Sequence, residues 1–593
     1  KMDFLGLRNL TVIDHTIKLL QQKDVIIEIE KIPMDDAKVY KLFAKGLTIG
    51  VFQFESSGMR EFLKKLKPTH FEDLIAMNAL YRPGPMKNID NFINRRSGKK
   101  KIEYVSPALK PILDETYGII VYQEQVMQIT NEIANFTLAQ ADILRRAIGK
   151  KNTELMEALK VKFINGASNN GMTKKQATNI YGLIEKFAQY GFNKSHSTAY
   201  AYISYQTAWL KTYHPAEFMA ANLTSEMNNI DRVVILINEC RKLKIDVLPP
   251  DINVSNVNFQ PIDDTSISFG MNAIKNVGGK ALDFIVAARE KDGPFNSIFD
   301  FTGRVDLQAV NKKVLESLIV SGSMDHLEGS RAEKVSTIDI ALRYGQNIQS
   351  ERYKNQVDLF GDSGNGSGVS MVPDLQEVRP WSDGEALANE KGVLGLYLTG
   401  HPLLEYADDL EDFSNHDFTE SIQDRNLKIV RIGGAIQNYK IHFDRKNKQM
   451  AFFTLECLGG HAEILVFSNT FAKYKELLSE DKIVFVSGKP TDNADFSDLK
   501  LVADEIVPLE KVRDYYAKSI NLQLDLENIL PQDIEDLHSL SKQYPGSCNL
   551  MFHYNDENQR KKRILSHNMR VSSSREFLTK LRDVYGKNNV WVL

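Results

Sequence analysis

The apolar residues of this chain repeat with two different periods, and one layer of secondary structure cannot satisfy both. Across residues 8–245 they fall mostly at helical spacing, whereas residues 425–512 hold short β-branched runs separated by turns. A helical stripe and a strand face bury against different kinds of partner. The chain of 593 residues is therefore expected to fold into several domains, about three to five at roughly 150 residues each.

Composition argues against two broad classes of protein. No run of 18 apolar residues occurs, so the sequence predicts no membrane span. Cys240, Cys457 and Cys548 lie far apart and form neither a disulfide framework nor a zinc-binding spacing, which is typical of a reducing cytoplasm. The net charge of -3 argues against a uniformly basic nucleic-acid binder, but it permits a local basic surface.

The sequence opens inside an alternating pattern, KMDFLGL (1–7). On a strand, Lys1 and Asp3 point to one face, while Met2 and Phe4 point to the other. A carboxylate beside an ammonium suits a metal and phosphate site. A solvated ion pair on an edge strand explains the same residues, and both interpretations stand at this point.

Two stretches of the helical region place arginines where phosphate could bind. Arg82 lies in YRPGP (81–85), after a helix predicted over 71–80, and its prolines and glycine make a rigid turn that can present the arginine. A plain helix stop is the alternative. The predicted helix ADILRRAIGKK (141–151) carries Arg145 and Arg146, a guanidinium pair that suits a triphosphate. Ordinary surface charge is the alternative there.

Further cations and aromatic side chains lie in the same region. The loop RRSGKKK (95–101) has five cations in seven residues, which favours a phosphate backbone. The segment YGFNKSHSTAYAY (190–202), which includes Lys194, is dense in hydrogen-bond donors and in aromatics that could stack on bases. A lone His196 is more often structural than catalytic, and no Ser-His-acid or Cys-His arrangement is apparent around it.

A domain boundary is predicted at LPPD (248–251), followed by a DNA-backbone motif. The segment MNAIKNVGGKALDFIVAARE (271–290) fits a short helix, a hairpin at 276–279 and a second helix. It resembles the helix-hairpin-helix motif, in which Gly278 and Gly279 would bring backbone amides close to a phosphate, with Lys280 beside them.

Residues 345–400 turn polar, and GDSGNGSG (361–368) is typical of a flexible linker. Just before it, QVDLF (356–360) contains Gln356 and the adjacent apolar pair Leu359 and Phe360. Two apolar anchors in a polar segment indicate a docking peptide.

The β-rich residues 425–512 are expected to form about five strands with one inserted helix near 472–478, which suits an OB barrel. Such a barrel often binds single strands and can instead bind protein. From 513 onward, short helices and strands surround a basic cluster at 560–563. The predicted fold class is multidomain and mainly α, with helical fingers and helix-hairpin-helix regions, a β-barrel OB domain and a small α/β C-terminal domain.

The order of these stretches resembles the bacterial replicative DNA polymerase III alpha subunits of the C-family, and within them the DnaE type. The resemblance is dense over 1–330 and loose after 512. It rests on KMDFLGL (1–7), GVFQFESSGM (50–59), LKPTHFEDLIAMNALYRPGPM (66–86), TYGIIVYQEQVM (116–127), LRRAIGKK (144–151) and YGFNKSH (190–196).

The resemblance implies template-directed nucleotidyl transfer by a two-metal mechanism with two Mg2+ ions. Asp3 matches the third palm aspartate of the family and would be a metal ligand, and Lys1 matches the basic residue two positions before it. The other two aspartates lie in a P-D-x-D-x-D-F motif that this sequence lacks. We therefore expect a C-terminal portion of the polymerase protein, beginning inside the palm and inactive alone.

The resemblance also implies ligands and partners. Arg145 and Arg146 would clamp the incoming deoxynucleoside triphosphate, and Arg82 and Lys194 would be further nucleotide contacts. The peptide at 356–360 would bind the ring-shaped sliding clamp (beta). Primer-template DNA is an expected ligand, the clamp-loader tau protein and a proofreading exonuclease are further candidate partners, and a cytoplasmic location without membrane contact is expected.

Six segments are expected along the chain. They are a palm remnant (1–9), fingers (10–247), a helix-hairpin-helix region (248–345), the clamp-binding peptide and linker (346–424), the OB domain (425–512) and a C-terminal α/β domain (513–593).

Two non-enzymatic interpretations compete with the polymerase. In the first, the chain is a DNA-binding and clamp-binding module that works only with an N-terminal partner. In the second, it is mainly an interaction scaffold whose peptide docks on the clamp through one amide and two apolar side chains. Both are compatible with a place in a polymerase, and they differ in whether this portion has a function alone.

Overall fold

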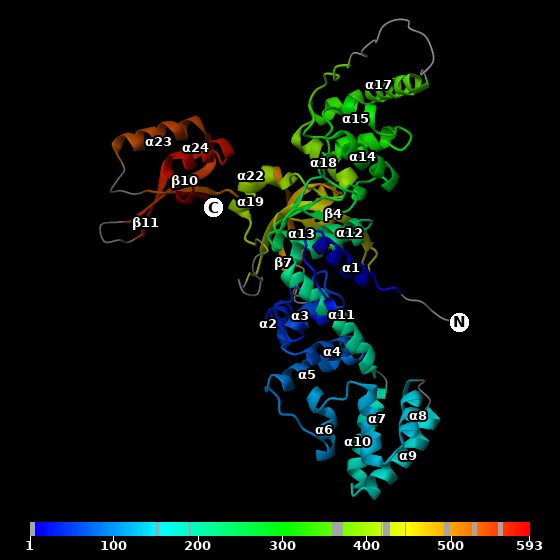
Figure 1. Cartoon of the computed structure of the whole chain (residues 1–593). Coiled ribbons are helices and arrows are strands. Elements are labelled where there is room, and N and C mark those ends of the chain that lie inside the picture. The colour runs from blue at the N-terminus through cyan, green and yellow to red at the C-terminus, as the bar shows by residue number, and fades with distance from the viewer. Residues whose placement is uncertain are drawn as a thin grey trace. The chain divides into compact units, whose positions relative to one another are not determined.

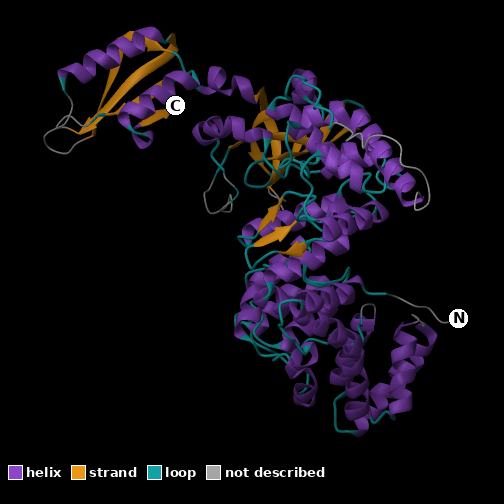
Figure 2. Ribbon diagram, turned by 45° about the horizontal axis from the view of Figure 1, so that its top comes forward, coloured by secondary structure: helices purple, strands orange, loops and turns teal. Residues whose placement is uncertain are grey.

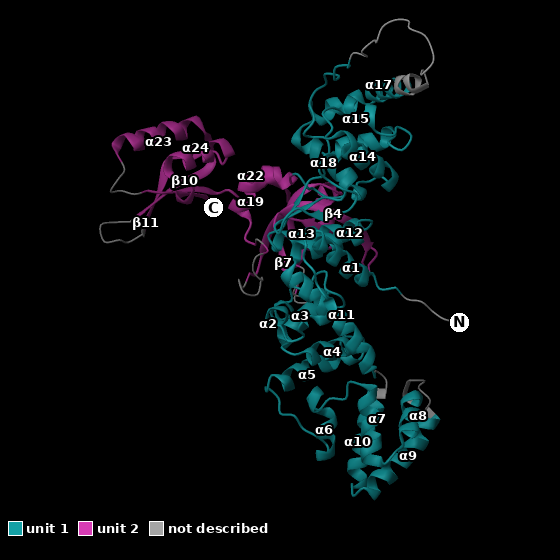
Figure 3. Cartoon of the chain, in the orientation of Figure 1, with its two compact units in different colours: residues 1–399 teal, residues 400–593 magenta. Residues whose placement is uncertain are grey.

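The structure, a computed structural model, describes residues 6–149, 153–188, 191–357, 372–416, 418, 427–444, 446–491, 499–524, 530–555 and 561–593. The chain divides into two compact units, residues 1–399 and residues 400–593 (Figure 3). In the described residues, none of the helices combines the length and apolar character needed to cross a bilayer.

Helices make up most of the first unit, as the helical spacing of its apolar residues predicts. Asp36, Ser56 and Asn193 each accept a hydrogen bond from a backbone N–H group at a helix start, which satisfies donors that the helix leaves free. The helices up to residue 242 are α1 (Arg8–Gln21), α2 (Ala37–Ala44), α3 (Ser57–Leu66), α4 (Phe71–Leu80), α5 (Ile89–Arg96), α6 (Lys110–Leu113), α7 (Gln123–Ala134), α8 (Leu138–Gly149), α9 (Thr153–Asn169), α10 (Lys174–Ala188), α11 (Lys194–Tyr213), α12 (Pro215–Glu226) and α13 (Ile230–Lys242) (Figure 1).

Two hydrophobic cores hold these helices. Helices α6 to α10 share a core that includes Ile129, Leu144, Phe163 and Tyr181, and they appear in cyan in Figure 1. The remaining helices belong to a larger core that continues to residue 396. Phe187, near the end of α10, belongs to the first of these cores, and Phe192, just before α11, packs against the second.

Helix α11 is anchored by a buried cation. Lys211 is fully buried, and its Nζ donates to the carbonyl oxygens of Leu47 and Ile49, at 2.8 Å each, and to Glu239 Oε1 at 2.6 Å. Burial lowers the pKa of Lys211 below its ordinary value, while the Glu239 carboxylate opposes that change. The contacts fix α11, whose opposite end carries Lys194.

In its described residues, the rest of the first unit combines a small sheet with five helices. Strands β1 (Asp246–Leu248), β2 (Gln260–Pro261) and β3 (Ser266–Ser268) form a sheet in the order β1-β3-β2. A 3-10 turn, Met271–Ala273, precedes α14. The helices are α14 (Gly279–Asp292), α15 (Ile298–Arg304), α16 (Lys312–Val320), α17 (Arg331–Val357) and α18 (Asp383–Leu394).

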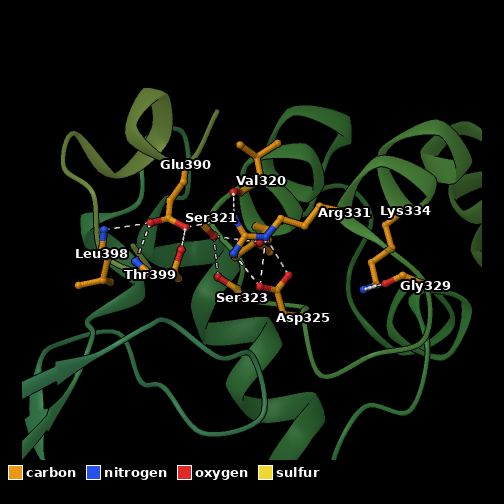
Figure 4. A network of polar contacts seen from close by, with 11 residues as sticks. Val320, Ser321, Ser323, Asp325, Gly329, Arg331, Lys334, Glu390, Leu398 and Thr399 are labelled. Carbon is orange, nitrogen blue, oxygen red and sulfur yellow. Dashed lines mark hydrogen bonds and ion pairs between the residues drawn. The ribbon is translucent and has the colours of Figure 1, made fainter. Parts of the chain in front are cut away.

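A buried polar network joins α17 and α18 (Figure 4). Glu390 is fully buried and accepts hydrogen bonds from the backbone N–H groups of Leu398 and Thr399, both at 2.9 Å, and from Arg331 Nη1 at 3.1 Å. Arg331 also pairs with Asp325. Burial opposes the charge on Arg331, but the carboxylates of Asp325 and Glu390 outweigh it and raise the pKa.

The second unit contains the predicted barrel. Strands β4 (Val430–Phe443), β5 (Gln449–Glu456), β6 (His461–Val466), β7 (Ile483–Pro490) and β8 (Leu499–Pro508) close in the order β4-β5-β6-β8-β7. Buried residues alternate along these strands, for example Ala462, Ile464 and Val466. Helix α21 (Ser468–Tyr474) is inserted between β6 and β7, a few residues earlier than the predicted 472–478.

A four-stranded sheet follows the barrel (strands in orange in Figure 2). Its strands are β9 (Ser519–Gln523), β10 (Pro545–Asn555), β11 (Lys561–Val571) and β12 (Val590–Val592), in the order β11-β10-β9-β12. Among the described residues of this unit, the helices besides α21 are α19 (Ala407–Phe413), α22 (Val512–Tyr516), α23 (Pro531–Gln543) and α24 (Arg575–Tyr585). The fold class is thus mainly α, with a barrel and a small α/β domain, as predicted.

The expectation of a peptide and linker over 346–424 differs from the structure. The 27-residue helix α17 runs through Val357, and the boundary between the two units falls at residue 399. Glu390, Leu394 and Leu396 are buried in the first unit. Low apolar content suggested a linker, but a few well-placed apolar and charged side chains suffice to pack α18.

Candidate nucleotide site in the helical unit

The rigid turn after α4 presents Arg82 to a small pocket. Gly84 has φ +106°, a conformation that side chains strongly disfavour, so the YRPGP turn requires glycine there. The Arg82 guanidinium carbon lies 3.5 Å from the centroid of the Phe192 ring. In the described part of the chain, no carboxylate pairs with Arg82. Burial lowers its pKa from the ordinary value.

The pocket has a volume of about 80 Å³. Its lining combines aromatic rings with polar side chains: Gln53, Met59, Asn78, Tyr81, Arg82, Phe192, His196, Ser197 and Tyr200. The Nδ2 atom of Asn78 is buried without a hydrogen-bond partner among the described residues. An unsatisfied buried donor beside an unpaired guanidinium suits a polar, anionic ligand.

An aromatic row runs along the start of α11. Phe192, His196 and Tyr200 are spaced four apart; His196 and Tyr200 lie on one face of α11, and Phe192 lies just before the helix begins at Lys194. The ring centroids of His196 and Tyr200 are 4.2 Å apart, and those of Phe192 and His196 are 5.4 Å apart. Among the described residues, His196 therefore packs between two aromatic rings, as expected for a structural histidine.

Lys194 lies close to this pocket but is paired. Its Nζ is 2.6 Å from Glu115 Oε2 and lies over the Tyr122 ring. The backbone N–H of Lys194 donates to Glu124 Oε2 at 2.9 Å. A phosphate would therefore compete with Glu115 for the Lys194 ammonium.

Arg145 and Arg146 both bind Asp142 on their own helix. Their Nε atoms donate to the two Asp142 oxygens at 2.8 and 2.7 Å. These hydrogen bonds lower the pKa of Asp142, whose carboxylate is therefore charged at neutral pH. The guanidinium pair predicted for a triphosphate is thus partly neutralised in place, which the sequence spacing did not indicate.

Gln123 connects the arginines to the pocket. Its Nε2 donates to the Gly191 carbonyl at 3.2 Å, and its Oε1 accepts from Arg145 Nη1 at 3.4 Å. A Cβ on Gly191 would meet the Phe187 ring at 2.5 Å, so only glycine allows this approach. Arg145 is therefore linked through Gln123 to the segment that supports Arg82.

The basic loop at 95–101 is partly structural. Arg96 forms an ion pair with Asp73 and donates to the Leu66 carbonyl at 3.1 Å. Arg95 donates to the Tyr117 carbonyl at 3.0 Å. The lysines at 99–101 are exposed. The run therefore offers fewer free cations to a phosphate backbone than its composition indicates.

The helix-hairpin-helix residues are open to solvent. Gly278 is the N-cap of α14, where no side chain satisfies the first backbone donors among the described residues, and Gly279 and Lys280 begin the helix. All three residues are exposed, and a Cβ on either glycine would meet no described atom within 4 Å. The free amides and the lysine are compatible with a phosphate at the helix start.

Several predicted residues lie outside the described structure. Lys1 and Asp3 do so, as do Leu359 and Phe360, whereas the backbone of Gln356 forms the last turn of α17. Among the described residues, no group of three or more His, Cys, Asp or Glu side chains could hold a metal ion. These residues therefore do not supply the expected magnesium site.

Sequence reasoning missed Asn78 and the carboxylates Glu115 and Asp142. Asn78 lies in an apolar helix, where one amide attracts little notice. The four-residue spacing of Phe192, His196 and Tyr200 is a signal that could have indicated the aromatic row.

Family models match four parts of the chain. They are described as the bacterial DNA polymerase III alpha subunit finger domain (residues 9–171), a helix-hairpin-helix motif (244–334), an OB-fold nucleic acid binding domain (430–509) and the C-terminal domain of the DNA polymerase III alpha subunit (520–584).

Similar proteins from several bacteria carry one name, DNA polymerase III subunit alpha. The protein of Pseudomonas aeruginosa is 39% identical over 619 residues, with 100% of this chain and 53% of that protein covered. Those of Vibrio cholerae and Escherichia coli K12 are 38% and 37% identical, each with 100% of this chain and 52% of the relative covered. The chain spans about half the length of the curated relatives it matches. The chain belongs to the family of DNA polymerase III alpha subunits.

Proposed function

We propose that this chain is part of a replicative DNA-directed DNA polymerase, and that its first unit binds the incoming deoxynucleoside triphosphate beside Arg82. The observation that supports this most directly is the pocket itself. An unpaired guanidinium lies over the ring of Phe192, and the unsatisfied amide of Asn78 lines the same pocket, among the residues that the structure describes. An anionic group of the ligand would pair with the positive guanidinium of Arg82, and a nucleobase could stack on the aromatic row.

The other proposed cations would change partners when the nucleotide binds. Lys194 would leave Glu115, and Arg145 and Arg146 would share their hydrogen bonds between Asp142 and the phosphate oxygens. Before the nucleotide binds, the carboxylates hold these long cationic side chains in place. Less conformational entropy is therefore lost on binding.

Metal chemistry and primer-template binding complete the proposal. Asp3 is proposed as one ligand of a pair of Mg2+ ions, and Lys1 as a neighbour that neutralises phosphate charge. Gly278, Gly279 and Lys280 are proposed to bind the DNA backbone, since their amides and ammonium are exposed at the start of α14. Binding of tau, binding of a proofreading exonuclease and a cytoplasmic location remain predictions of the sequence.

Asp142→Asn tests the proposed phosphate site. Removing the carboxylate charge frees Arg145 and Arg146, so in the complete polymerase the KM for deoxynucleoside triphosphates is expected to fall about two- to fivefold at low salt. This decrease in KM should become smaller as ionic strength rises. Steady-state primer extension over a range of nucleotide concentrations measures it.

Glu157→Gln is the matched control, because it also removes one carboxylate that pairs with a cation, Lys160, on a neighbouring helix. Its KM should equal that of the wild type. An unchanged or higher KM for Asp142→Asn would remove the two arginines from the proposal.

The peptide at 356–360 is proposed to bind the sliding clamp. Truncating both anchors, Leu359→Ala with Phe360→Ala, is expected to reduce retention of the chain on immobilised clamp about tenfold, since apolar anchors dominate such contacts. Asp358→Ala, beside the anchors, is the control and should be retained normally. Equal retention of wild type and both variants would rule the peptide out.

A further inference from the structure

The four-stranded sheet of the second unit has a face that nucleotide binding does not use. Successive side chains of a strand point to opposite faces of the sheet. The core beneath helices α23 and α24 takes Ile520, Leu522, Leu550, Val590 and Val592. The residues between them in the strands therefore line the other face.

The strand registers gather one set of side chains on that face. Asn521 is paired with Met551 on one side and with Trp591 on the other, and His553 is paired with Arg563. The ring centroids of His553 and Trp591 are 4.8 Å apart, and His553 Nε2 lies 2.9 Å from Asn521 Oδ1. Asn521 is only 1% exposed, whereas both rings are half-buried. An aromatic pair thus rests on a buried amide.

The same face is cationic. The four strands contain no Asp or Glu. Arg563 and Arg570 are exposed, and neither guanidinium forms an ion pair with any residue that the structure describes. Burial and the nearby charge of Arg563 lower the pKa of His553, so its ring is neutral at neutral pH. Positive charge without a described counter-ion calls for an anionic ligand.

We propose that this face, defined by Asn521, Asn549, His553, Arg563, Arg570 and Trp591 and called the open sheet face, binds single-stranded DNA. Bases stack on the Trp591 and His553 rings, while Arg563 and Arg570 pair with the phosphates. Asn549 lies opposite Arg570 and supplies an amide that can contact a base edge.

A single strand fits this face better than other anions. A duplex hides its bases from a flat aromatic surface, and an acidic peptide would use the guanidinium groups but leave the aromatic pair without a function. Other four-stranded sheets with aromatic side chains on one face bind single strands by stacking two or three bases. The inference does not depend on the nucleotide site, and either can fail without the other.

Trp591 provides a local probe. The chain has three tryptophans, so Trp209→Phe with Trp381→Phe leaves Trp591 as the only one. Titrating this full chain with a short oligothymidylate is expected to quench the emission of Trp591 to saturation. Unchanged emission at saturating oligonucleotide, with binding confirmed by anisotropy, would place the DNA elsewhere and overturn the proposal.

Charge variants test the phosphate contacts. For Arg563→Ala with Arg570→Ala, the slope of log affinity against log salt should shrink by about 1.4, roughly 0.7 for each phosphate contact with a single strand. Lys542→Ala with Lys580→Ala removes equal charge from the helical side and should keep the wild-type slope. Equal slopes in the two double variants would refute the phosphate contacts.

The stacking contact has its own test. Trp591→Ala should weaken oligonucleotide binding roughly 5- to 100-fold, whereas Trp591→Phe should retain most of the affinity because the ring still stacks. Thermal unfolding identifies any variant that fails to fold. Poly-glutamate that quenches Trp591 as strongly as the oligonucleotide, at equal charge concentration, would assign the face to an acidic protein and overturn the proposal.

Discussion

Replacing Arg82 with alanine in the complete polymerase is expected to lower kcat/KM for nucleotide incorporation by about 100- to 1000-fold, as removal of a preorganised transition-state donor does. Among the proposed cations, replacing Arg82 should lower kcat/KM most, because no carboxylate among the described residues competes with the ligand for its guanidinium. Its guanidinium already packs on Phe192, with 3.5 Å between the guanidinium carbon and the ring centroid. Single-nucleotide primer extension over a range of triphosphate concentrations measures the loss.

Arg82→Lys separates charge from geometry. The ammonium keeps the charge but loses the bidentate fork and the contact of the guanidinium with the Phe192 ring, so an intermediate loss is expected. Arg241→Ala, on the exposed side of α13, removes an equal charge away from the pocket and should leave kcat/KM unchanged. A loss below about threefold for Arg82→Ala, in a protein with normal thermal unfolding, would take Arg82 out of the nucleotide site.

Replacing Glu390 with alanine is expected to lower the free energy of unfolding of the first unit by about 3–5 kcal/mol, because it breaks a buried ion pair. Four donors lose their acceptor: the backbone N–H groups of Leu398 and Thr399, the Thr399 hydroxyl and Arg331 Nη1 (Figure 4). Urea unfolding measures the change, and hydrogen exchange at Leu398 and Thr399 should accelerate with it.

Glu385→Ala is the matched control on the same helix. Glu385 belongs to an exposed capping box with Ser382, so its loss should destabilise the unit much less than the loss of Glu390. Glu390→Gln keeps the volume and one acceptor oxygen, and it should fall between the two. If Glu390→Ala and Glu385→Ala destabilised the unit equally, the buried network would not be what holds α18.

Local pattern accounts for much of the fold. Helix α4 ends at Leu80 before the YRPGP turn, as the sequence predicts, and α3 likewise ends at Leu66, just before Pro68. A proline removes a backbone donor and restricts the residue before it, so such stops need no tertiary information. The strands of the barrel follow equally from short β-branched runs and their turns.

Pairing of charges could not be predicted in this way. Arg96 pairs with Asp73, 23 residues earlier, and Lys194 with Glu115, 79 residues earlier. Sequence spacing places a cation on a helix face, but it does not say which carboxylate the folded chain brings within hydrogen-bond distance. For the same reason α18 was expected in a linker although Glu390 on it is fully buried.

The sequence by itself determined the helical and barrel regions, their order and the family, because hydrophobic period, turn residues and motif order are local properties of the chain. Only the tertiary structure decided that, among the described residues, Arg82 stays unpaired on Phe192 while Arg145, Arg146 and Lys194 are held by carboxylates. The physical reason is the distance along the chain over which each property is decided. Secondary structure is set by residues a few positions apart, whereas the cations that remain free to bind a ligand depend on ion pairs between residues far apart in the sequence.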